Sequence, residues 1–579
     1  MLLRTNTLTN NGATNKLTAP ALDKWFILAV LFAVLFKSWL TSDVRILPYY
    51  GPHDTTNYLE HAVSLASGHW FGTYDNLTLI KQPFFPIYLA LVEQIGLPLP
   101  TAHLLLDALA GIVACLAVAP LIKGHARLIT LFLILYFNPF SYDSLAWLTL
   151  RSQINPDLAL LSISCAFGIY TSRAGRRRNA VLWSVGLGAS FSAFWLTREE
   201  AVWLVPGVLM IFAAYVLWAV RQDRSKVRWM RLVILVPCVI LAISVGSVMI
   251  KNGLTYGWFV TNEQQAPEFD SAYNSLARID VSADRHFPAP KAAREIAYRV
   301  SPAAKELEKS FEGPNGTGWV SIACGADPDI CVTQHDIARG WFQFAFRDAV
   351  SAAGHHSSGA SARAYYVELA RQLDAACAAQ EIRCTPKGHT LYPLLQGRDA
   401  ASIASAAVSG LQNLLLFKSL SFDPWAYDMP SASLVADYNF VARSVDDGAA
   451  PNRPHEFDHA LKQGLIRQFG RGYEVLMGPC VCAMLLLVAF RIYRAIARRA
   501  AVKDHVVLAS SVLVSVLMLV FVLSIITVYS FNSFNAEYMG AMMPLILLAF
   551  SVTLLHEGLI SRRVLSRHIS RAGNRARLE

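Results

Sequence analysis

Residues 506–529 read VVLASSVLVSVLMLVFVLSIITVY, an apolar run that contains no acidic or basic side chain. A helix of about 20 apolar residues crosses a hydrocarbon core roughly 30 Å thick. Inside lipid each backbone amide must find its partner within the same segment, so such a run predicts a helix. Comparable runs recur, and we predict about ten spanning helices at residues 24–41, 102–122, 128–149, 156–172, 180–197, 201–220, 231–250, 474–491, 506–529 and 538–557. The predicted fold class is an all-α polytopic membrane protein.

The composition supports this class. Of 579 residues, 54% are hydrophobic and 16% are charged, whereas a soluble domain carries about 25% charged residues. The formal net charge is +10, but the basic residues gather in short stretches beside the apolar runs, at Arg173–Arg178, Arg221–Arg231, Arg491–Lys503 and Arg562–Arg577. Basic clusters of this kind mark cytoplasmic loops. They favour the lipid bilayer as the partner and exclude a nucleic acid.

The placement of these clusters also predicts the sidedness of the chain. With a cytoplasmic N-terminus and about ten spans, every basic cluster falls on the cytoplasmic side. A further span at Pro83–Leu97 would move the clusters at 173–178 and 221–231 to the other side, so we expect 83–97 to lie at the interface. We predict a multi-pass protein of the bacterial inner (plasma) membrane with both termini in the cytoplasm.

The same pattern divides the chain into domains. Residues 251–473 are charged, punctuated by proline and free of spanning runs, which predicts a mostly helical extracytoplasmic domain inserted between the seventh and eighth helices. The predicted domains are a cytoplasmic tail at 1–23, a membrane domain at 24–250 with a first outer loop at 42–101, the soluble domain at 251–473, the last helices at 474–557 and a basic cytoplasmic tail at 558–579.

Four cysteines lie in the predicted soluble domain. Cys324 and Cys331 have a C-x6-C spacing, and Cys377 and Cys384 have the same spacing. On the oxidising side of a membrane this pattern predicts two disulfides. Four cysteines allow three connectivities, and the sequence does not choose among them. A zinc site is the alternative, although zinc ligands are usually closer together, as C-x2–4-C.

The first outer loop contains the motif that points to an activity. Residues 49–59 read YYGPHDTTNYL, and residues 81–86 read KQPFFP at the start of an apolar segment. An acidic residue just beyond the first helix, followed by a Lys-x-Pro-x-x-Pro entry, resembles the GT-C superfamily of integral membrane glycosyltransferases. Protein mannosyltransferases and lipid A aminoarabinose transferases are examples. The resemblance covers the membrane part to about residue 220 and the overall layout.

The resemblance implies an enzyme that moves a sugar from a polyprenyl-phosphate donor to an acceptor outside the cytoplasm. The first-loop acid of the superfamily falls on Asp54, as a general base towards an acceptor hydroxyl or as a metal ligand. Many members carry paired acids here, whereas this chain has His53-Asp54 followed by Thr, Thr and Asn, so the need for a divalent cation stays open. The alternative is that Asp54 only caps a helix that begins near Thr55.

Charged residues elsewhere on the outer side complete the predicted site. An arginine fork can bind two phosphate oxygens at once, so we predict that Arg198 holds the donor phosphate, with Arg151 and Lys81 as the next choices. The alternative is that Arg198 pairs with a neighbouring glutamate. The residues predicted to complete an outward-facing cleft are His53, Glu199, Glu537 and Tyr538. A purely interfacial role is the alternative for the last two.

Two other classes of protein remain as alternatives. One is a transporter or flippase of a lipid-linked solute, and the other is a non-catalytic membrane scaffold whose outer domain binds a partner. Convergence of Asp54, Arg151, Arg198 and Glu537 on one cavity would favour the transferase, and scattering of these residues would favour the scaffold. The sequence specifies neither the sugar nor the acceptor.

Overall fold

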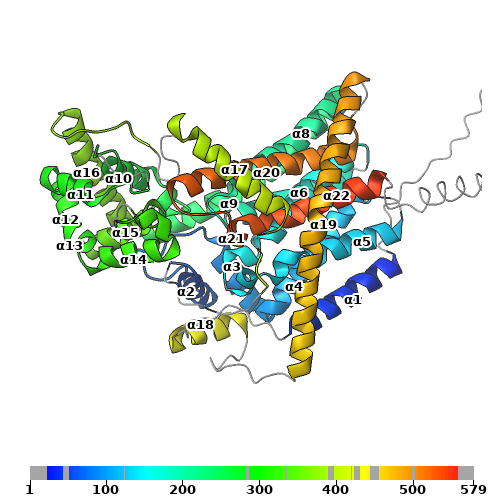
Figure 1. Cartoon of the computed structure of the whole chain (residues 1–579), viewed down its shortest axis with the longest axis horizontal. Helices are drawn as coiled ribbons and strands as arrows, with labels where there is room; N and C mark the ends of the chain where they lie inside the picture. Colours follow the sequence, from blue (N-terminus) through cyan, green and yellow to red (C-terminus); the bar gives the residue numbers. More distant parts are fainter. Residues whose placement is uncertain are drawn as a thin grey trace, which may run out of the picture.

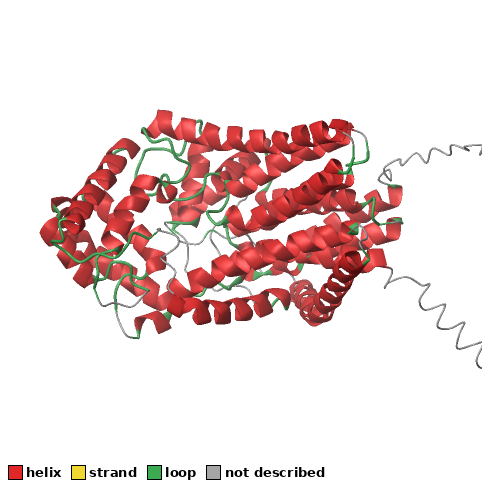
Figure 2. Ribbon diagram, turned by 90° about the horizontal axis from the view of Figure 1, so that it is seen from above, coloured by secondary structure: helices red, strands yellow, loops and turns green. Residues whose placement is uncertain are grey.

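The computed structural model describes most of the chain, at residues 23–42, 48, 51, 53–122, 124–175, 177–222, 224–281, 286–332, 335–388, 397–418, 420–422, 431–443, 456–498 and 502–557. The predicted tails at 1–23 (apart from Asp23) and 558–579 lie outside these residues, as do Tyr49, Tyr50 and Pro52. The described residues form helices and loops, and their only β feature is an isolated bridge between Ile279 and Cys384 (Figure 2). The predicted all-α class is confirmed.

Six helical stretches of the described residues are long and apolar enough to cross a membrane. They are α4 (Leu99–Val118), η4 with α8 (Ala201–Leu204, Val205–Val220), α9 (Arg224–Tyr256), α19 (Glu456–Ala497), α20 (Asp504–Tyr529), and α21, η8 and α22 in succession (Ala536–Met539, Gly540–Met542, Met543–Glu557). Their number makes the chain an integral, multi-pass membrane protein. α19 runs across the direction of α20 and α22 rather than alongside them (Figure 1).

Other predicted spans correspond to shorter or more polar helices. These are α1 (Lys24–Leu40), α6 (Asn155–Thr171) and α7 (Arg177–Trp195). The segment at 83–97 contains α3 (Phe84–Ile95), whose 12 residues are too few to span. The count of about ten spans therefore stays a prediction.

The predicted span at 128–149 is wrong. Its helix, α5 (His125–Tyr136), has only 12 residues. Asn138 ends it, because its side chain accepts a hydrogen bond from the backbone N–H of Ser141, and Pro139 follows at the first position of a new turn. The chain then continues as three short turns, η1 (Pro139–Tyr142), η2 (Ser144–Trp147) and η3 (Arg151–Gln153). The third turn carries Arg151 to the site described below.

A separate helical domain projects from one end of the bundle, and the last residues of α22 lie at the other end (Figure 1). This projecting domain consists of η5 (Glu263–Gln265), α10 (Pro267–Ala277), α11 (Lys291–Val300), α12 (Pro302–Glu306), α13 (Glu308–Phe311), α14 (Pro314–Ala326), η6 (Pro328–Cys331), α15 (Arg339–Ala352) and α16 (Gly359–Ala378). We call it the α10–α16 domain. Its core also includes Phe71, Tyr74 and Leu79, which follow α2 (Thr55–Ala66) in the first loop. The loop and the domain therefore share one hydrophobic core.

The predicted soluble segment 251–473 is not a single unit in the structure. α9 extends into it as far as Tyr256, and α19 begins within it at Glu456. η7 (Gly397–Asp399) leads into α17 (Ala400–Leu415), which packs along α20, and α18 (Ala432–Ala442) packs on α2 and α3. Leu414 and Leu434 belong to the same buried cluster as the bundle helices. Among the described residues of this segment, those from Tyr256 to Leu373 belong to a hydrophobic core separate from that of the bundle.

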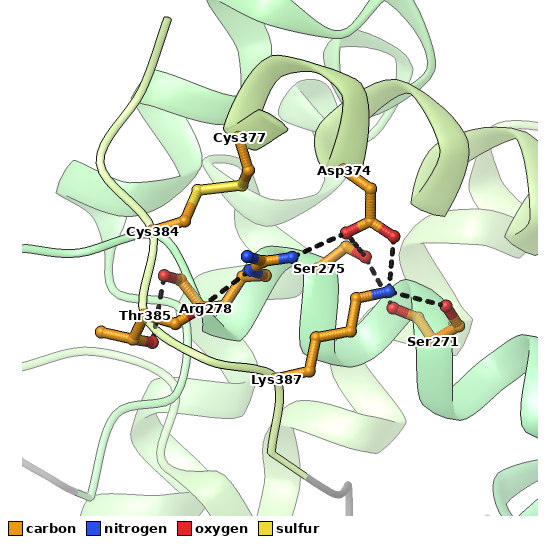
Figure 3. The surroundings of a disulfide bond; sticks show 8 residues. All are labelled: Ser271, Ser275, Arg278, Asp374, Cys377, Cys384, Thr385 and Lys387. Atoms are coloured by element: carbon orange, nitrogen blue, oxygen red, sulfur yellow. Dashed lines mark hydrogen bonds and ion pairs between the residues drawn. A yellow bond between two sulfur atoms is a disulfide. The ribbon is translucent and has the colours of Figure 1, made fainter. Parts of the chain in front are cut away.

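The α10–α16 domain contains the two predicted disulfides. Cys324 bonds to Cys331 and Cys377 bonds to Cys384, so each bridge closes a short local loop. This selects one of the three connectivities and excludes the zinc alternative for these sulfurs. The second bridge joins the end of α16 to a segment that Asp374, Arg278 and Lys387 hold against α10 (Figure 3).

Candidate active site

A polar cavity of about 660 Å³ lies where the first loop, the α7–η4 connection, the start of α15 and the α20–α21 connection meet. All but one of the predicted catalytic, phosphate-binding and cleft residues line it, namely Asp54, Lys81, Arg151, Arg198, Glu199, Glu537 and Tyr538. His53 is the exception and lies behind the wall. The predicted residues therefore converge on one cavity, as expected of a site, and are not scattered interfacial charges.

Asp54 occupies the N-cap position of α2 but makes no capping hydrogen bond with its side chain. The carbonyl of Gly51 accepts hydrogen bonds from the backbone N–H groups of Asp54 (2.9 Å) and Thr56 (3.1 Å), so a backbone turn performs the capping. The Asp54 carboxylate is 37% exposed, and its Oδ1 lies 3.0 Å from Lys81 Nζ. Tyr58 donates a longer hydrogen bond of 3.4 Å to the same oxygen. The capping alternative for Asp54 is therefore wrong.

Lys81 is held by the backbone on both sides of it. Asn262 donates to the carbonyl of Ile80 at 2.8 Å, and the N–H of Gln82 donates to Glu199 Oε1 at 3.1 Å. The Nζ atom of Lys81 lies 5.1 Å from the centre of the Phe344 ring. This brings the ammonium group between the first loop and α15.

Arg151 and Glu199 form a largely buried ion pair. Arg151 NH1 donates to Glu199 Oε2 at 2.6 Å and to the carbonyl of Thr197 at 3.3 Å. Burial alone would raise the pKa of Glu199, but the charges of Arg151 and Lys81 lower it to about 2. Glu199 is therefore ionised at neutral pH and orients Arg151.

Arg198 is 2% exposed and has two glutamate partners. Its Nε donates to Glu200 Oε1 at 2.5 Å, and its NH1 donates to the backbone carbonyl of Glu537 at 3.3 Å and lies 3.5 Å from Glu537 Oε1. The guanidinium also lies 4.8 Å from the centre of the Tyr538 ring. The alternative that Arg198 pairs with a neighbouring glutamate therefore describes the protein as it stands, and a ligand would have to compete with these carboxylates.

The polar cavity is also lined by charged side chains that sequence reasoning did not single out. They are Glu200, Asp327, Asp329 and Arg339. Asp327 and Asp329 lie inside the loop closed by Cys324 and Cys331. No sequence signal distinguishes Arg339, which starts an ordinary amphipathic helix. Only the fold brings it to the cavity.

The donor set around Asp54 does not fit a divalent cation. Hard cations take several oxygen ligands, whereas Asp54 Oδ1 already faces the ammonium of Lys81. Among the described residues, a group of three side chains that could hold a metal ion lies elsewhere, at His505, His556 and Glu557, and in the other such group, Cys324, Cys331 and His335, the two cysteines are joined in a disulfide. We therefore derive no step through a metal ion.

A second polar cluster lies among the bundle helices. Lys37 of α1 is 2% exposed, and its Nζ lies 2.5 Å from Asp107 Oδ2 of α4 and 2.8 Å from the carbonyl of Tyr136. Lys37, Asp107 and Asp157 of α6 line a separate cavity of about 90 Å³. The ion pair between Lys37 and Asp107 lowers the cost of holding these two charges at membrane depth.

Fold and cavity together define a class, that of integral membrane proteins with a charged cavity between a helical bundle and a helical outer domain. No family model matches the chain, and no curated protein matches it. The chain is similar to ArnT from Cupriavidus metallidurans in the apo state, at 17% identity and a TM-score of 0.31, over 89% of this chain and 77% of that chain. The structure of the same ArnT bound to undecaprenyl phosphate gives 15% identity and a TM-score of 0.27, over 89% and 78%. Similarities of this size do not identify an activity, and the proposal below rests on the cavity.

Proposed function

We propose that this protein is a membrane glycosyltransferase of the GT-C type, which moves a sugar from a polyprenyl-phosphate donor to an acceptor at the extracytoplasmic face. The observation that carries the proposal is the position of Asp54. Its carboxylate is not used as a helix cap, lies beside Lys81 and lines a 660 Å³ cavity together with Arg151 and Arg198. A partly exposed carboxylate beside fixed cations can serve as the base while the cations stabilise a leaving phosphate.

The chemistry follows from these groups. The acceptor hydroxyl attacks the anomeric carbon, and Asp54 takes the hydroxyl proton as the new C–O bond forms. The bond between the anomeric carbon and the phosphate oxygen breaks, and polyprenyl phosphate leaves with both electrons. Lys81 and Arg198 stabilise the negative charge that develops on the leaving phosphate. Arg151 keeps Glu199 ionised and fixed behind Lys81.

Arg198 can meet a phosphate without unfolding its surroundings. Its contacts with Glu200 and Glu537 use the Nε and NH1 atoms. We expect NH2 to reach a phosphate oxygen first and a phosphate held by both NH1 and NH2 to displace the Glu537 carboxylate from NH1. The binding energy is the difference between these two partners, so we expect moderate rather than very tight binding of the donor.

The disulfides support the proposed sidedness. They form and persist in oxidising compartments, and residues 326–329, within or beside the loop closed by Cys324 and Cys331, line the polar cavity. This supports an extracytoplasmic position of the cavity, while the proposal of cytoplasmic termini rests on the basic clusters of the sequence. On this side, the start of α15 supplies a wall for recognition of the acceptor.

Replacement of Asp54 by Asn in the native host tests the proposal. We expect turnover to fall by about a hundredfold or more, because general-base catalysis contributes roughly that factor. Surface glycans should lose the transferred sugar and the lipid-linked donor should accumulate, both measured by mass spectrometry. Glu60→Gln is the matched control, because Glu60 is exposed on the same helix and does not line the cavity. Unchanged glycans in a folded Asp54→Asn protein would reject the proposed activity.

A transporter or flippase of a lipid-linked solute is the second candidate function. The Lys37–Asp107–Asp157 cluster favours it, since ionisable residues within a bundle often mark a transport pathway. Under this alternative, Asp107→Asn should abolish translocation of the lipid-linked solute in proteoliposomes, and Asp54→Asn should not. The transferase predicts the reverse sensitivity for sugar transfer.

A further inference from the structure

We propose that Asp348 of α15 is a positioning residue that orients Asp54 through the imidazole of His53, so that the α10–α16 domain sets the geometry of the catalytic base. The inference rests on the proposed function and adds two residues to its machinery. Neither residue lines the polar cavity. Both act from behind its wall.

His53 is enclosed by the α10–α16 domain. Its Nε2 is buried and lies 3.6 Å from Asp348 Oδ1, which is close enough for an ion pair but too long for a hydrogen bond. Its ring lies 5.0 Å from the ring of Trp319 and 5.2 Å from the ring of Phe344, measured between centres. The residue directly before Asp54 is therefore held by one charge and two aromatic faces from outside the first loop.

Asp348 is itself fixed in place. Its Oδ1 accepts a hydrogen bond from Asn76 Nδ2 at 2.7 Å, and its Oδ2 accepts one from Trp319 Nε1 at 2.9 Å. Burial would raise the pKa of Asp348, but His53, Trp319 and Asn76 together lower it. An ionised carboxylate with this many partners has one orientation and can fix the His53 ring.

The residue before Asp348 anchors the same turn of α15. Arg347 is fully buried, donates to the carbonyl of Asn76 and lies 3.1 Å from Glu263 Oε2. Two consecutive residues of α15 therefore contact the first loop. Arg347 contacts Asn76, and Asp348 contacts both Asn76 and His53. The base is tied to a rigid part of the outer domain.

Asp54 needs this support because α2 holds its carboxylate only through the long hydrogen bond from Tyr58. Its side chain makes no cap hydrogen bond, and its remaining contacts are with Lys81 and Tyr58. Phe344 joins the two sides, since it packs on His53, lies near Lys81 and lines the cavity. A shift of α15 on binding an acceptor would therefore move the base and the phosphate-binding lysine together.

The test uses the full-length chain in native-host membranes, which supply donor and acceptor. We expect Asp348→Asn to lower turnover roughly tenfold to a hundredfold, as misplacement of a reacting group does. His53→Asn should give the same loss, and the double variant should lose no more, because the two residues act through one contact. Binding of undecaprenyl phosphate to the purified variants should stay within about twofold of wild type, since the phosphate-binding cations are unchanged.

Asp374→Asn is the matched control. Asp374 is also an ion-paired aspartate of the α10–α16 domain, with Arg278 and Lys387 as its partners (Figure 3). None of these three residues lines the polar cavity. It should leave turnover unchanged. A melting temperature that falls for Asp348→Asn, with turnover restored by assay at lower temperature, would show a merely structural role and overturn the inference.

Hydrogen–deuterium exchange separates this inference from the proposed function. In Asp348→Asn the amides of residues 53–58 should exchange about tenfold faster, while those of α16 stay as in wild type. Unchanged exchange at 53–58 overturns the positioning role whatever the activity is. Faster exchange at 53–58 combined with full activity of Asp54→Asn would instead reject the transferase and leave the mechanical link between the two parts intact.

Discussion

Two clusters of charge in this molecule use the same residue types in different ways. In the first, which we call the Glu263 cluster, the fully buried carboxylate of Glu263 accepts hydrogen bonds from Tyr366 at 2.6 Å and Tyr74 at 2.8 Å and faces Arg347 and His356 at 3.1 and 3.3 Å. In the polar cavity, Asp54 is 37% exposed and faces one cation. A buried carboxylate with four partners, such as that of Glu263, marks a structural centre. A carboxylate with few partners that faces a cavity, such as that of Asp54, marks a candidate site.

The Glu263 cluster joins the first loop to the α10–α16 domain. Tyr74 comes from the loop, and the remaining members come from the domain. Glu263 also donates its backbone N–H to the carbonyl of Leu79 at 2.8 Å, two residues before Lys81. The structural centre therefore supports the site without taking part in its chemistry.

The largest expected effect is on Glu263. Glu263→Gln should lower the free energy of unfolding of the α10–α16 domain by about 3–5 kcal/mol, because it leaves the Arg347 charge buried without its partner. Urea titration read by hydrogen exchange of α16 measures this. Glu268→Gln is the control, since its partner Arg363 is 55% exposed and such pairs contribute less than about 1 kcal/mol. Equal losses in both variants would remove the distinction between the clusters.

Acid should weaken the same cluster. Burial would raise the pKa of Glu263, but Arg347 and His356 lower it from 4.5 to about 2. A depressed folded-state pKa gives stability that is complete above pH 4.5 and is lost as the pH falls towards 2. The loss should amount to about 3 kcal/mol, from the 1.36 kcal/mol that each pKa unit represents. A Glu263→Gln protein should lack this step in a plot of stability against pH, and retention of the full step would assign it to other carboxylates.

The parts of the fold that the sequence predicts are those decided by local pattern. Uncharged runs such as 506–529 give helices because lipid leaves the backbone no other partner. The error at 128–149 also had a local signal, since Asn138-Pro139 is a turn dipeptide, but the apolar residues around it outweighed that signal. No local sequence signal predicts that α17 and α18 pack on the bundle, because both helices are ordinary amphipathic segments.

The residues of the site also fall into those that the sequence predicts and those that it does not. Asp54 is predicted from the resemblance of the first outer loop to the GT-C superfamily, whereas Arg151 and Arg198 stand out because charges next to apolar runs are rare and costly. Arg339 and Asp348 lie in a charged soluble segment, where nothing in the sequence separates them from solvated neighbours. Their roles follow from the packing of α15 on the first loop, which is a long-range contact that no local pattern encodes.

Removal of either disulfide should have an effect on stability of intermediate size, and the two disulfides can be compared with each other. Both loops have a sequence separation of 7, so removal of either bridge by two Cys→Ser changes should cost about 2.5 kcal/mol by loop entropy. Only the loop of Cys324 and Cys331 contributes lining residues to the polar cavity. We therefore expect similar losses of stability for both variants but a loss of turnover only for the Cys324/Cys331 variant. Loss of turnover in both variants would mean that the domain fold, rather than the cavity wall, limits activity.

The smallest effect on stability should come from the residue with the largest effect on activity. Asp54→Asn removes a partly exposed ion pair with Lys81, which contributes less than about 1 kcal/mol. Asp54 caps no helix, so α2 should also keep its N-terminus, held by the Gly51 carbonyl. Urea titration of Asp54→Asn beside Glu263→Gln measures both clusters in one experiment. A loss for Asp54→Asn as large as that for Glu263→Gln would make Asp54–Lys81 a structural pair and would remove the reason for placing catalysis there. A loss of turnover at unchanged stability means instead that the exposed carboxylate is kept for the reaction.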